Sequence, residues 1–190
     1  MRKSILTLVT VAIAASLIFS GVVSTGCAST GDQRIQELEA KVQELQDVRA
    51  IQDLRASYCY YTDTNDWQNI ATLFTDDAVC DFGPFGFYDG KAAITEFFRD
   101  LLPAGMVFTM HMTHNPKIQV SGDTGSGEWY YEVAATTTDN QAYWIAGKYI
   151  ENYVKVNGMW QFKKIVADWY YNTPYDKGWA EEGMLHDPSP

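Results

Sequence analysis

The chain has 190 residues and a formal net charge of −10 at neutral pH, with 24 acidic residues against 14 basic ones. This charge argues against nucleic acid and anionic lipid headgroups as partners, because both would be repelled. The length fits one domain whose core is stable without disulfides or a structural metal.

The first residues have the pattern of a bacterial export signal. Basic residues at positions 2–3 precede an apolar run at positions 5–19, and Gly26-Cys27 resembles a lipobox. We therefore expect a signal peptide over residues 1–26, lipid modification of Cys27, and export to the outer face of a bacterial membrane. Membrane contact is then expected through the lipid anchor only. An uncleaved signal anchor is the alternative, because the apolar run approaches the length of a membrane span.

A short tether is expected over residues 27–34, and the next residues predict a long helix from Gln33 to about Thr62. Apolar residues recur early in this helix at heptad spacing, at Ile35, Leu38, Val42 and Leu45. Two heptads are too few for a stable free coiled coil. They either pair with a second subunit in a homo-oligomer or lie on the surface of the domain itself.

The second half of this helix combines an apolar face with polar residues. Val48, Ile51, Leu54 and Tyr58 recur at spacings of three and four, which predicts a buried face. Asp63 follows at the helix end, where a carboxylate is unfavourable next to the helix dipole. We therefore expect Asp63 to have a compensating partner, or else to be solvated or to cap the next helix.

Cys59 and Cys80 are the cysteines that follow Cys27. Outside the cytoplasm they could form a disulfide. Both also occur where small buried residues are expected, so buried thiols are the other interpretation. Their spacing is not typical of a zinc site, and we expect neither a metal nor a cofactor.

Beyond Asp63 the sequence predicts short elements and then a long antiparallel meander. The short elements are a second helix from Trp67 to Asp76-Asp77, a strand at residues 78–82, a turn at 83–86, a strand at 87–88 and a third helix at 91–102 that ends before Pro103. The meander has strands at residues 107–120, 128–138, 142–156 and 159–171, and a surface tail is expected at residues 176–190.

Two signals within the meander are specific. Pro116 predicts an edge strand or a bulge in its first strand. Asn157-Gly158 predicts a tight hairpin between the last two strands. Together the elements predict one α+β domain over residues 35–175, in which a curved antiparallel sheet wraps over a long N-terminal helix.

Several of these motifs resemble SnoaL-like proteins of the nuclear transport factor 2-like superfamily. The matching motifs are Arg49-Ala-Ile-Gln-Asp-Leu54 followed by Tyr58 and Asp63, His111 in Met-His-Met, Gly127-Glu-Trp-Tyr130, and the Asn157-Gly158 hairpin. The resemblance covers nearly all of residues 35–175 and includes bile acid 7α-dehydratases and hexachlorocyclohexane dehydrochlorinases. It implies a cone-shaped sheet, the NTF2-like or cystatin-like roll, around an apolar pocket.

The resemblance also implies an active site. In those enzymes a helix aspartate orients a strand histidine, which removes a proton from an alicyclic substrate. Matched to this chain, Asp63 takes the orienting position, His111 is the base, and Tyr58 matches a catalytic tyrosine of the bile acid dehydratases. A carboxylate suits this role because it fixes the histidine tautomer and stabilises the imidazolium that forms. A tyrosine hydroxyl can polarise a carbonyl or assist a leaving hydroxyl.

Four further residues are expected to line the pocket: Trp129, Tyr131, Val133 and Trp169. Such an aromatic wall suits a flat, apolar or polycyclic ligand. The bile acid dehydratases carry an acidic residue in place of Val133 and an arginine in place of Trp169. Dehydration of bile acids themselves is therefore not expected.

The sequence thus predicts a cofactor-independent lyase or isomerase that uses a His/Asp dyad on a small hydrophobic molecule. The alternative is a module without catalysis, which binds a hydrophobic ligand or serves assembly at the membrane. A single histidine on a strand is more often structural than catalytic. The position of His111 relative to Asp63 therefore decides how far the catalytic interpretation can be taken.

Overall fold

The structure is a computed structural model that describes residues 26–181, with side chains from residue 30 onward. The signal peptide predicted at residues 1–26 lies outside the described residues except for Gly26. The side chain of Cys27 and the tail beyond residue 181 also lie outside them. The chain divides into two units, residues 1–38 and residues 39–190. Within the described part, no helix is both long and apolar enough to cross a membrane.

Helix α1 runs from Gly26 to Asp63, close to the predicted end at Thr62. Residues 27–34, predicted as a tether, are helical. Each residue added to a formed helix gains a hydrogen bond, and no proline interrupts this stretch. The heptad residues are each more than half exposed; they are Ile35, Leu38, Val42 and Leu45. Pairing with a second subunit remains a prediction.

Six strands form one curved sheet in the order β2-β1-β6-β5-β4-β3. Their bounds are Phe74–Asp81 for β1, Phe87–Asp89 for β2, Met106–Ser121 for β3, Thr124–Thr137 for β4, Ala142–Val156 for β5 and Met159–Pro174 for β6. Strands β3 to β6 make the predicted antiparallel meander. Strand β1 adds to it beside β6 in parallel orientation, which the sequence did not predict. The predicted α+β class with a curved sheet is confirmed.

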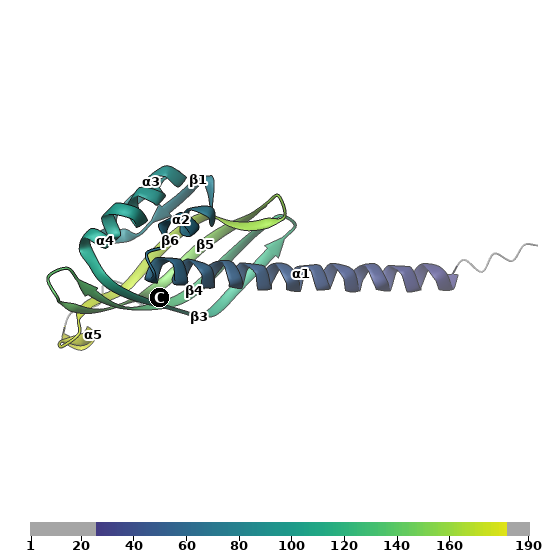
Figure 1. Cartoon of the computed structure of the whole chain (residues 1–190). Helices are drawn as coiled ribbons and strands as arrows, with labels where there is room; N and C mark the ends of the chain where they lie inside the picture. The colour runs from purple at the N-terminus through teal and green to yellow at the C-terminus, as the bar shows by residue number, and fades with distance from the viewer. Residues whose placement is uncertain (1–25, 182–190) are drawn as a thin grey trace, which may run out of the picture. The chain divides into compact units, whose positions relative to one another are not determined.

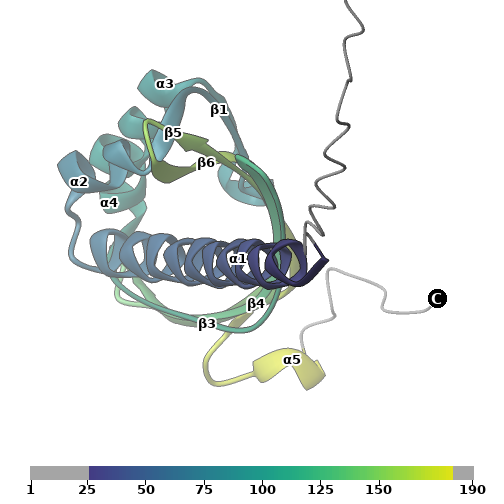
Figure 2. The same cartoon turned by 90° about the vertical axis from the view of Figure 1, so that its right-hand side faces the viewer.

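The sheet curves around the part of α1 that follows residue 38, and helices α2, α3 and α4 lie at its open side (Figures 1 and 2). The short helical elements are α2 (Trp67–Thr72), the 3₁₀ turn η1 (Gly83–Phe85), α3 (Lys91–Glu96), the π-helical η2 (Phe97–Leu101), α4 (Leu102–Gly105) and α5 (Gly178–Glu181). Asp66 caps α2, because its carboxylate accepts the backbone N–H of Asn69 at 3.2 Å.

Two predicted helix ends are wrong. The second helix stops at Thr72 rather than at Asp76-Asp77, because Phe74 is fully buried and pairs with Phe162 as the start of β1. The third helix continues past Pro103 through η2 into α4. Pro103 falls in the first turn of α4, directly after the π-helical η2.

Both specific signals within the meander are confirmed. Strand β3 is an edge strand, and its pairing with β4 shifts register between His114 and Lys117, next to Pro116. Asn157 and Gly158 have φ angles of 52° and 81°, the left-handed pair that a type I′ hairpin requires.

The core lies between the concave face of the sheet, α1 and the α3–η2 segment, and it is rich in aromatic rings. Phe74, Phe98 and Phe162 surround the Tyr58 ring, with centroid distances of 5.7–6.3 Å. Cys59 and Cys80 are both buried free thiols, which settles the choice left open by the sequence. Burial raises the pKa of both thiols, so they stay protonated and pack as small apolar groups.

Candidate active site

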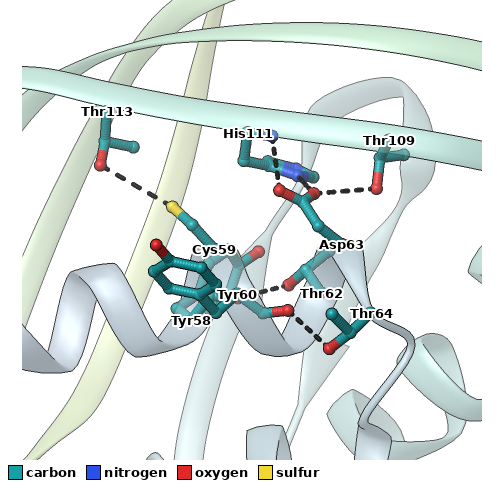
Figure 3. A network of polar contacts seen from close by, with 9 residues as sticks. All are labelled: Tyr58, Cys59, Tyr60, Thr62, Asp63, Thr64, Thr109, His111 and Thr113. Carbon is teal, nitrogen blue, oxygen red and sulfur yellow. Dashed lines mark hydrogen bonds and ion pairs between the residues drawn. The ribbon is translucent and has the colours of Figure 1, made fainter.

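Asp63 and His111 are brought together from the end of α1 and the middle of β3 (Figure 3). The Asp63 Oδ1 atom lies 2.6 Å from Nδ1 of the His111 ring, and Oδ2 accepts the backbone N–H of His111 at 2.8 Å. Thr109 donates its hydroxyl to Oδ1 at 3.0 Å. The carboxylate predicted to need a partner therefore has three donors on one strand. These donors compensate its unfavourable position at the helix end.

This arrangement fixes the state of the histidine ring. Because a carboxylate accepts hydrogen bonds, the Nδ1 atom of His111 carries the proton that faces Asp63. The Nε2 atom is then the ring nitrogen that remains for a ligand. The His111 side chain is 11% exposed and that of Asp63 is 22% exposed, so both groups keep contact with water. Because water reaches this pair, a charge that forms on it during a reaction does not incur the full desolvation cost of a buried charge.

A cavity of about 50 Å³ lies beside His111, between α1, the concave face of the sheet and the α3–α4 segment. Most of its wall is aromatic or aliphatic. The side chains in the wall that carry polar atoms are Tyr58, Thr62, Thr109, His111, Tyr131, Tyr149 and Trp169. This volume holds only a few water molecules. The polycyclic ligand that the sequence suggested would fit only if side chains moved, and a small molecule suits the observed space better.

The structure places most of the predicted site residues at this cavity. Tyr58, His111, Tyr131, Val133 and Trp169 all line it, and Asp63 reaches it through the His111 ring.

Trp129 is not among the residues that line this cavity. Its indole N–H donates to the Tyr153 hydroxyl at 2.8 Å, away from the cavity. Alternation along β4 correctly put Trp129 on the same face as Tyr131 and Val133. Alternation gives the face of a strand, but it does not tell how far along the cone a residue lies.

Tyr58 reaches the cavity from α1, one helical turn before Asp63. Its ring meets the His111 ring edge-on, with 6.4 Å between centroids. Burial and the neighbouring Tyr149 raise the pKa of Tyr58, while Arg55 opposes them. The hydroxyl therefore stays protonated at neutral pH and can donate a hydrogen bond to a ligand.

Trp169 forms part of the wall because a glycine lets it approach the turn after β1. Its indole N–H donates to the backbone carbonyl of Phe82 at 3.2 Å. A Cβ atom on Gly83 would lie only 2.8 Å from Nε1 of Trp169, and Gly83 also has a φ of 59°. The turn predicted at residues 83–86 thus serves to seat a cavity residue.

Several cavity residues were missed from the sequence, Thr109 and Tyr149 among them. Thr109 precedes His111 by two positions on β3, so strand alternation could have placed it beside the histidine. Tyr149 stacks on Tyr131 with 4.2 Å between ring centroids. The Tyr131 hydroxyl is buried and has no hydrogen-bond partner among the described residues. It is a polar group that a ligand in the cavity could satisfy.

Residues 26–181 contain no group of three or more His, Cys, Asp or Glu side chains arranged to hold a metal ion. The site consists of a carboxylate–histidine pair next to a mostly apolar cavity in an α+β cone. This combination is typical of small enzymes and ligand-binding proteins with a curved sheet.

A family model described as a SnoaL-like domain matches residues 43–166, and the chain belongs to this family. A solved structure of a hexachlorocyclohexane dehydrochlorinase (LinA type 2) is 26% identical, with 70% of this chain and 92% of that chain covered and a TM-score of 0.67.

Two proteins from Novosphingobium aromaticivorans are also similar. One, assigned as a scytalone dehydratase, is 25% identical over 69% of this chain and 89% of that chain, with a TM-score of 0.64. The other, assigned as an aromatic ring hydroxylase, is 28% identical over 68% and 94% of the two chains, also with a TM-score of 0.64. The structural neighbours of this SnoaL-like chain thus include dehydrochlorinase and dehydratase folds.

Proposed function

We propose that the protein is a cofactor-independent lyase or isomerase in which His111 removes a proton from a small hydrophobic molecule. The observation that carries this proposal is the two-point contact between Asp63 and His111 at the wall of the cavity. A purely structural histidine would need neither a partly buried carboxylate on its Nδ1 atom nor an Nε2 atom directed to an apolar space.

The proposed reaction begins when Nε2 of His111 accepts a proton from a carbon of the substrate. The imidazolium that forms lies against the Asp63 carboxylate, which stabilises its charge. The protonated hydroxyl of Tyr58 donates a hydrogen bond to the oxygen or leaving group on which negative charge develops. The apolar wall keeps water away, which strengthens both interactions.

The similar proteins named as a dehydrochlorinase and a dehydratase support elimination as the reaction type. Both names denote the loss of a small molecule from neighbouring carbon atoms, and such a reaction requires removal of a proton. The cavity volume of about 50 Å³ favours a compact substrate over a polycyclic one.

A ligand-binding module without turnover is the second candidate. It is favoured by Val133 and Trp169, which stand where the bile acid dehydratases carry an acid and an arginine. In this case the unpartnered Tyr131 hydroxyl would hold a ligand, and His111 would serve only as a hydrogen-bond donor or acceptor.

Two probes test the proposed reaction. Nitrobenzisoxazole loses a ring C–H proton to a base, its N–O bond breaks, and a coloured phenolate is released. γ-Hexachlorocyclohexane releases chloride when HCl is eliminated. We expect His111→Ala to lower kcat/KM by about 100-fold or more, the usual contribution of a general base.

His114→Ala is the matched control, because His114 is an exposed histidine on the same strand. It should leave turnover of both probes unchanged. If the wild-type protein and His111→Ala convert both probes at the same rate, the catalytic proposal fails and the ligand-binding module is favoured.

We also propose that the protein is exported and anchored at the outer face of a bacterial membrane through lipid on Cys27. The support is the sequence pattern of residues 1–27. In cells fed a palmitate analogue, the full chain should incorporate label and sediment with membranes, and Cys27→Ala should do neither. Equal labelling of the two proteins would contradict the proposal.

A further inference from the structure

A buried ion pair lies beneath the cavity and has no part in the mechanism described above. Arg55 on α1 and Glu151 on β5 both have fully buried side chains, with Nη2 and Oε1 3.0 Å apart. The other carboxylate oxygen of Glu151 accepts a hydrogen bond from the Tyr153 hydroxyl, which in turn accepts the indole N–H of Trp129. The position of the negative partner is thus fixed by β4 and β5.

The Arg55 guanidinium contacts the cavity only through aromatic rings. Its Cζ atom lies 4.3 Å from the Tyr58 ring centroid and 3.9 Å from that of Tyr149. Both tyrosines line the cavity, whereas Arg55 does not. A cation on one side of these two phenol rings therefore acts on whatever binds at their hydroxyls.

Stability alone gives a poor account of this pair. Replacing a buried ion pair by apolar residues of similar volume is often neutral or stabilising, because removing two charges from water is costly. The three guanidinium nitrogens of Arg55 also lack a hydrogen bond of good geometry to any described residue. Burial opposes the charge on Arg55, but the interactions with Glu151, Cys59, Tyr149 and Tyr58 together outweigh burial and raise the pKa of Arg55, so it stays positively charged.

We propose that Arg55 is a positioning residue of the cavity, which holds the Tyr58 and Tyr149 rings and favours anionic over neutral ligands at their hydroxyls. This inference rests on the proposed function, because proton abstraction creates the negative charge that Arg55 would stabilise. The chemical class it selects is a compact apolar molecule that develops an oxyanion or releases an anion.

The test removes the charge without leaving an unpaired partner. Arg55→Met combined with Glu151→Gln makes the pair neutral at similar volume. Lys155→Met combined with Asp47→Asn is the matched control. That pair also joins α1 to β5, is largely buried with 2.7 Å between its charged atoms, and does not line the cavity. Circular dichroism and thermal melting establish that each variant folds.

The first measurement is binding of para-nitrophenol, whose phenolate form absorbs visible light. We expect wild type and the Lys155/Asp47 variant to bind the phenolate in preference to the phenol. The Arg55/Glu151 variant should lose about tenfold of this preference, the factor that corresponds to one unit in the pKa of the bound probe. An unchanged preference, or no binding of nitrophenol to wild type, overturns the proposal.

The second measurement is turnover of nitrobenzisoxazole, which forms a phenolate as it reacts. Loss of Arg55 should lower kcat with little change in KM, because the anion forms only as the reaction proceeds. Arg55→Lys keeps the charge but cannot stack its ammonium between two rings, so it should retain phenolate preference and still lower kcat. If the neutral double variant does not fold, Arg55→Lys tests the positioning role through kcat, and an unchanged kcat overturns the proposal.

The two proposals fail in distinguishable ways. If wild type shows no turnover that depends on His111 yet prefers the phenolate through Arg55, the proposed reaction fails and the role of Arg55 stands. If turnover depends on His111 and the neutral Arg55/Glu151 variant matches wild type in kcat and in anion preference, the role of Arg55 fails alone.

Discussion

Two pairs of ionisable side chains join the same helix to the same sheet, and they differ in burial, in partners and in charge. Asp63–His111 sits where α1 ends, with side chains 22% and 11% exposed, whereas Arg55–Glu151 has no exposed side-chain surface. Asp63 receives three hydrogen bonds from β3. Arg55 is held between aromatic rings. The first pair can exchange a proton with a ligand, and the second can only hold a fixed charge.

The difference shows how position along the cone assigns a role to a polar group. A histidine that must gain and lose a proton needs a partner that accepts both states and some access to water. An arginine sealed among rings keeps its charge at any pH at which the protein folds. The part of the cone at Asp63 and His111, which water reaches, therefore suits chemistry; we call it the open end. The part at Arg55 and Glu151, which has no exposed side-chain surface, suits a constant electrostatic field; we call it the closed end.

The largest expected effect comes from breaking the sealed pair. Glu151→Ala leaves Arg55 as an uncompensated buried charge, and we expect the free energy of unfolding to fall by about 3–5 kcal/mol. Asp63→Ala should cost less, because it leaves no buried charge without a partner and water can reach the His111 ring. Urea unfolding of the two variants measures the difference. Equal losses would remove the distinction between the two ends of the cone.

Asp63→Asn tests the open end, and its effect should appear in catalysis. Both carboxylate oxygens of Asp63 accept hydrogen bonds. In asparagine one oxygen is replaced by an NH₂ group, which faces either the backbone N–H of His111 or Nδ1 of its ring. In the second case the proton moves to Nε2, and the base is lost. We expect kcat on nitrobenzisoxazole to fall by about 10²–10⁴-fold.

The tautomer can be read directly. Long-range ¹H–¹⁵N NMR should show a protonated Nδ1 on His111 in wild type and a protonated Nε2 in Asp63→Asn. If the variant keeps the wild-type tautomer and the wild-type rate, Asp63 does not orient the histidine.

The sequence identified the open end of the cone better than the closed end. Asp63 stood out because a carboxylate at a helix end calls for a partner, and family resemblance supplied His111. The β1–β6 pairing was not predictable, because a parallel contact between distant strands leaves no local pattern.

Glu151 was missed for a different reason. In β5 the apolar Ile150 is 41% exposed and the charged Glu151 is 1% exposed, the reverse of what hydrophobicity predicts. Tyr149 and Tyr153 fix the inward face of the strand, and Glu151 shares it by alternation. Arg55 follows Ile51 by four residues and precedes Tyr58 by three, so helical spacing alone placed it inside. Only their contact explains why two charges are tolerated there.

Asp47 and Lys155 form a third pair between α1 and the sheet, of intermediate burial. Its expected effect is the smallest, because it appears only in acid. Burial alone would raise the pKa of Asp47. Hydrogen bonds from Lys155, Trp160 and Gln43 outweigh burial and hold the pKa below its usual 3.8. Since the pKa is lower in the folded state, Asp47 stabilises the fold at pH values above 3.8, and this contribution is lost as the pH falls through the folded-state pKa.

Urea unfolding between neutral pH and about pH 3 should therefore show a steeper loss of stability in wild type than in Asp47→Asn. The variant should be the less stable protein at neutral pH, and the two curves should converge in acid. The Arg55–Glu151 pair lies beyond the reach of water and should contribute equally to both curves. Parallel curves would mean that the Asp47 carboxylate is no better stabilised in the folded protein than in the unfolded chain. Asp47 would then add nothing to the comparison between the Asp63–His111 pair and the Arg55–Glu151 pair.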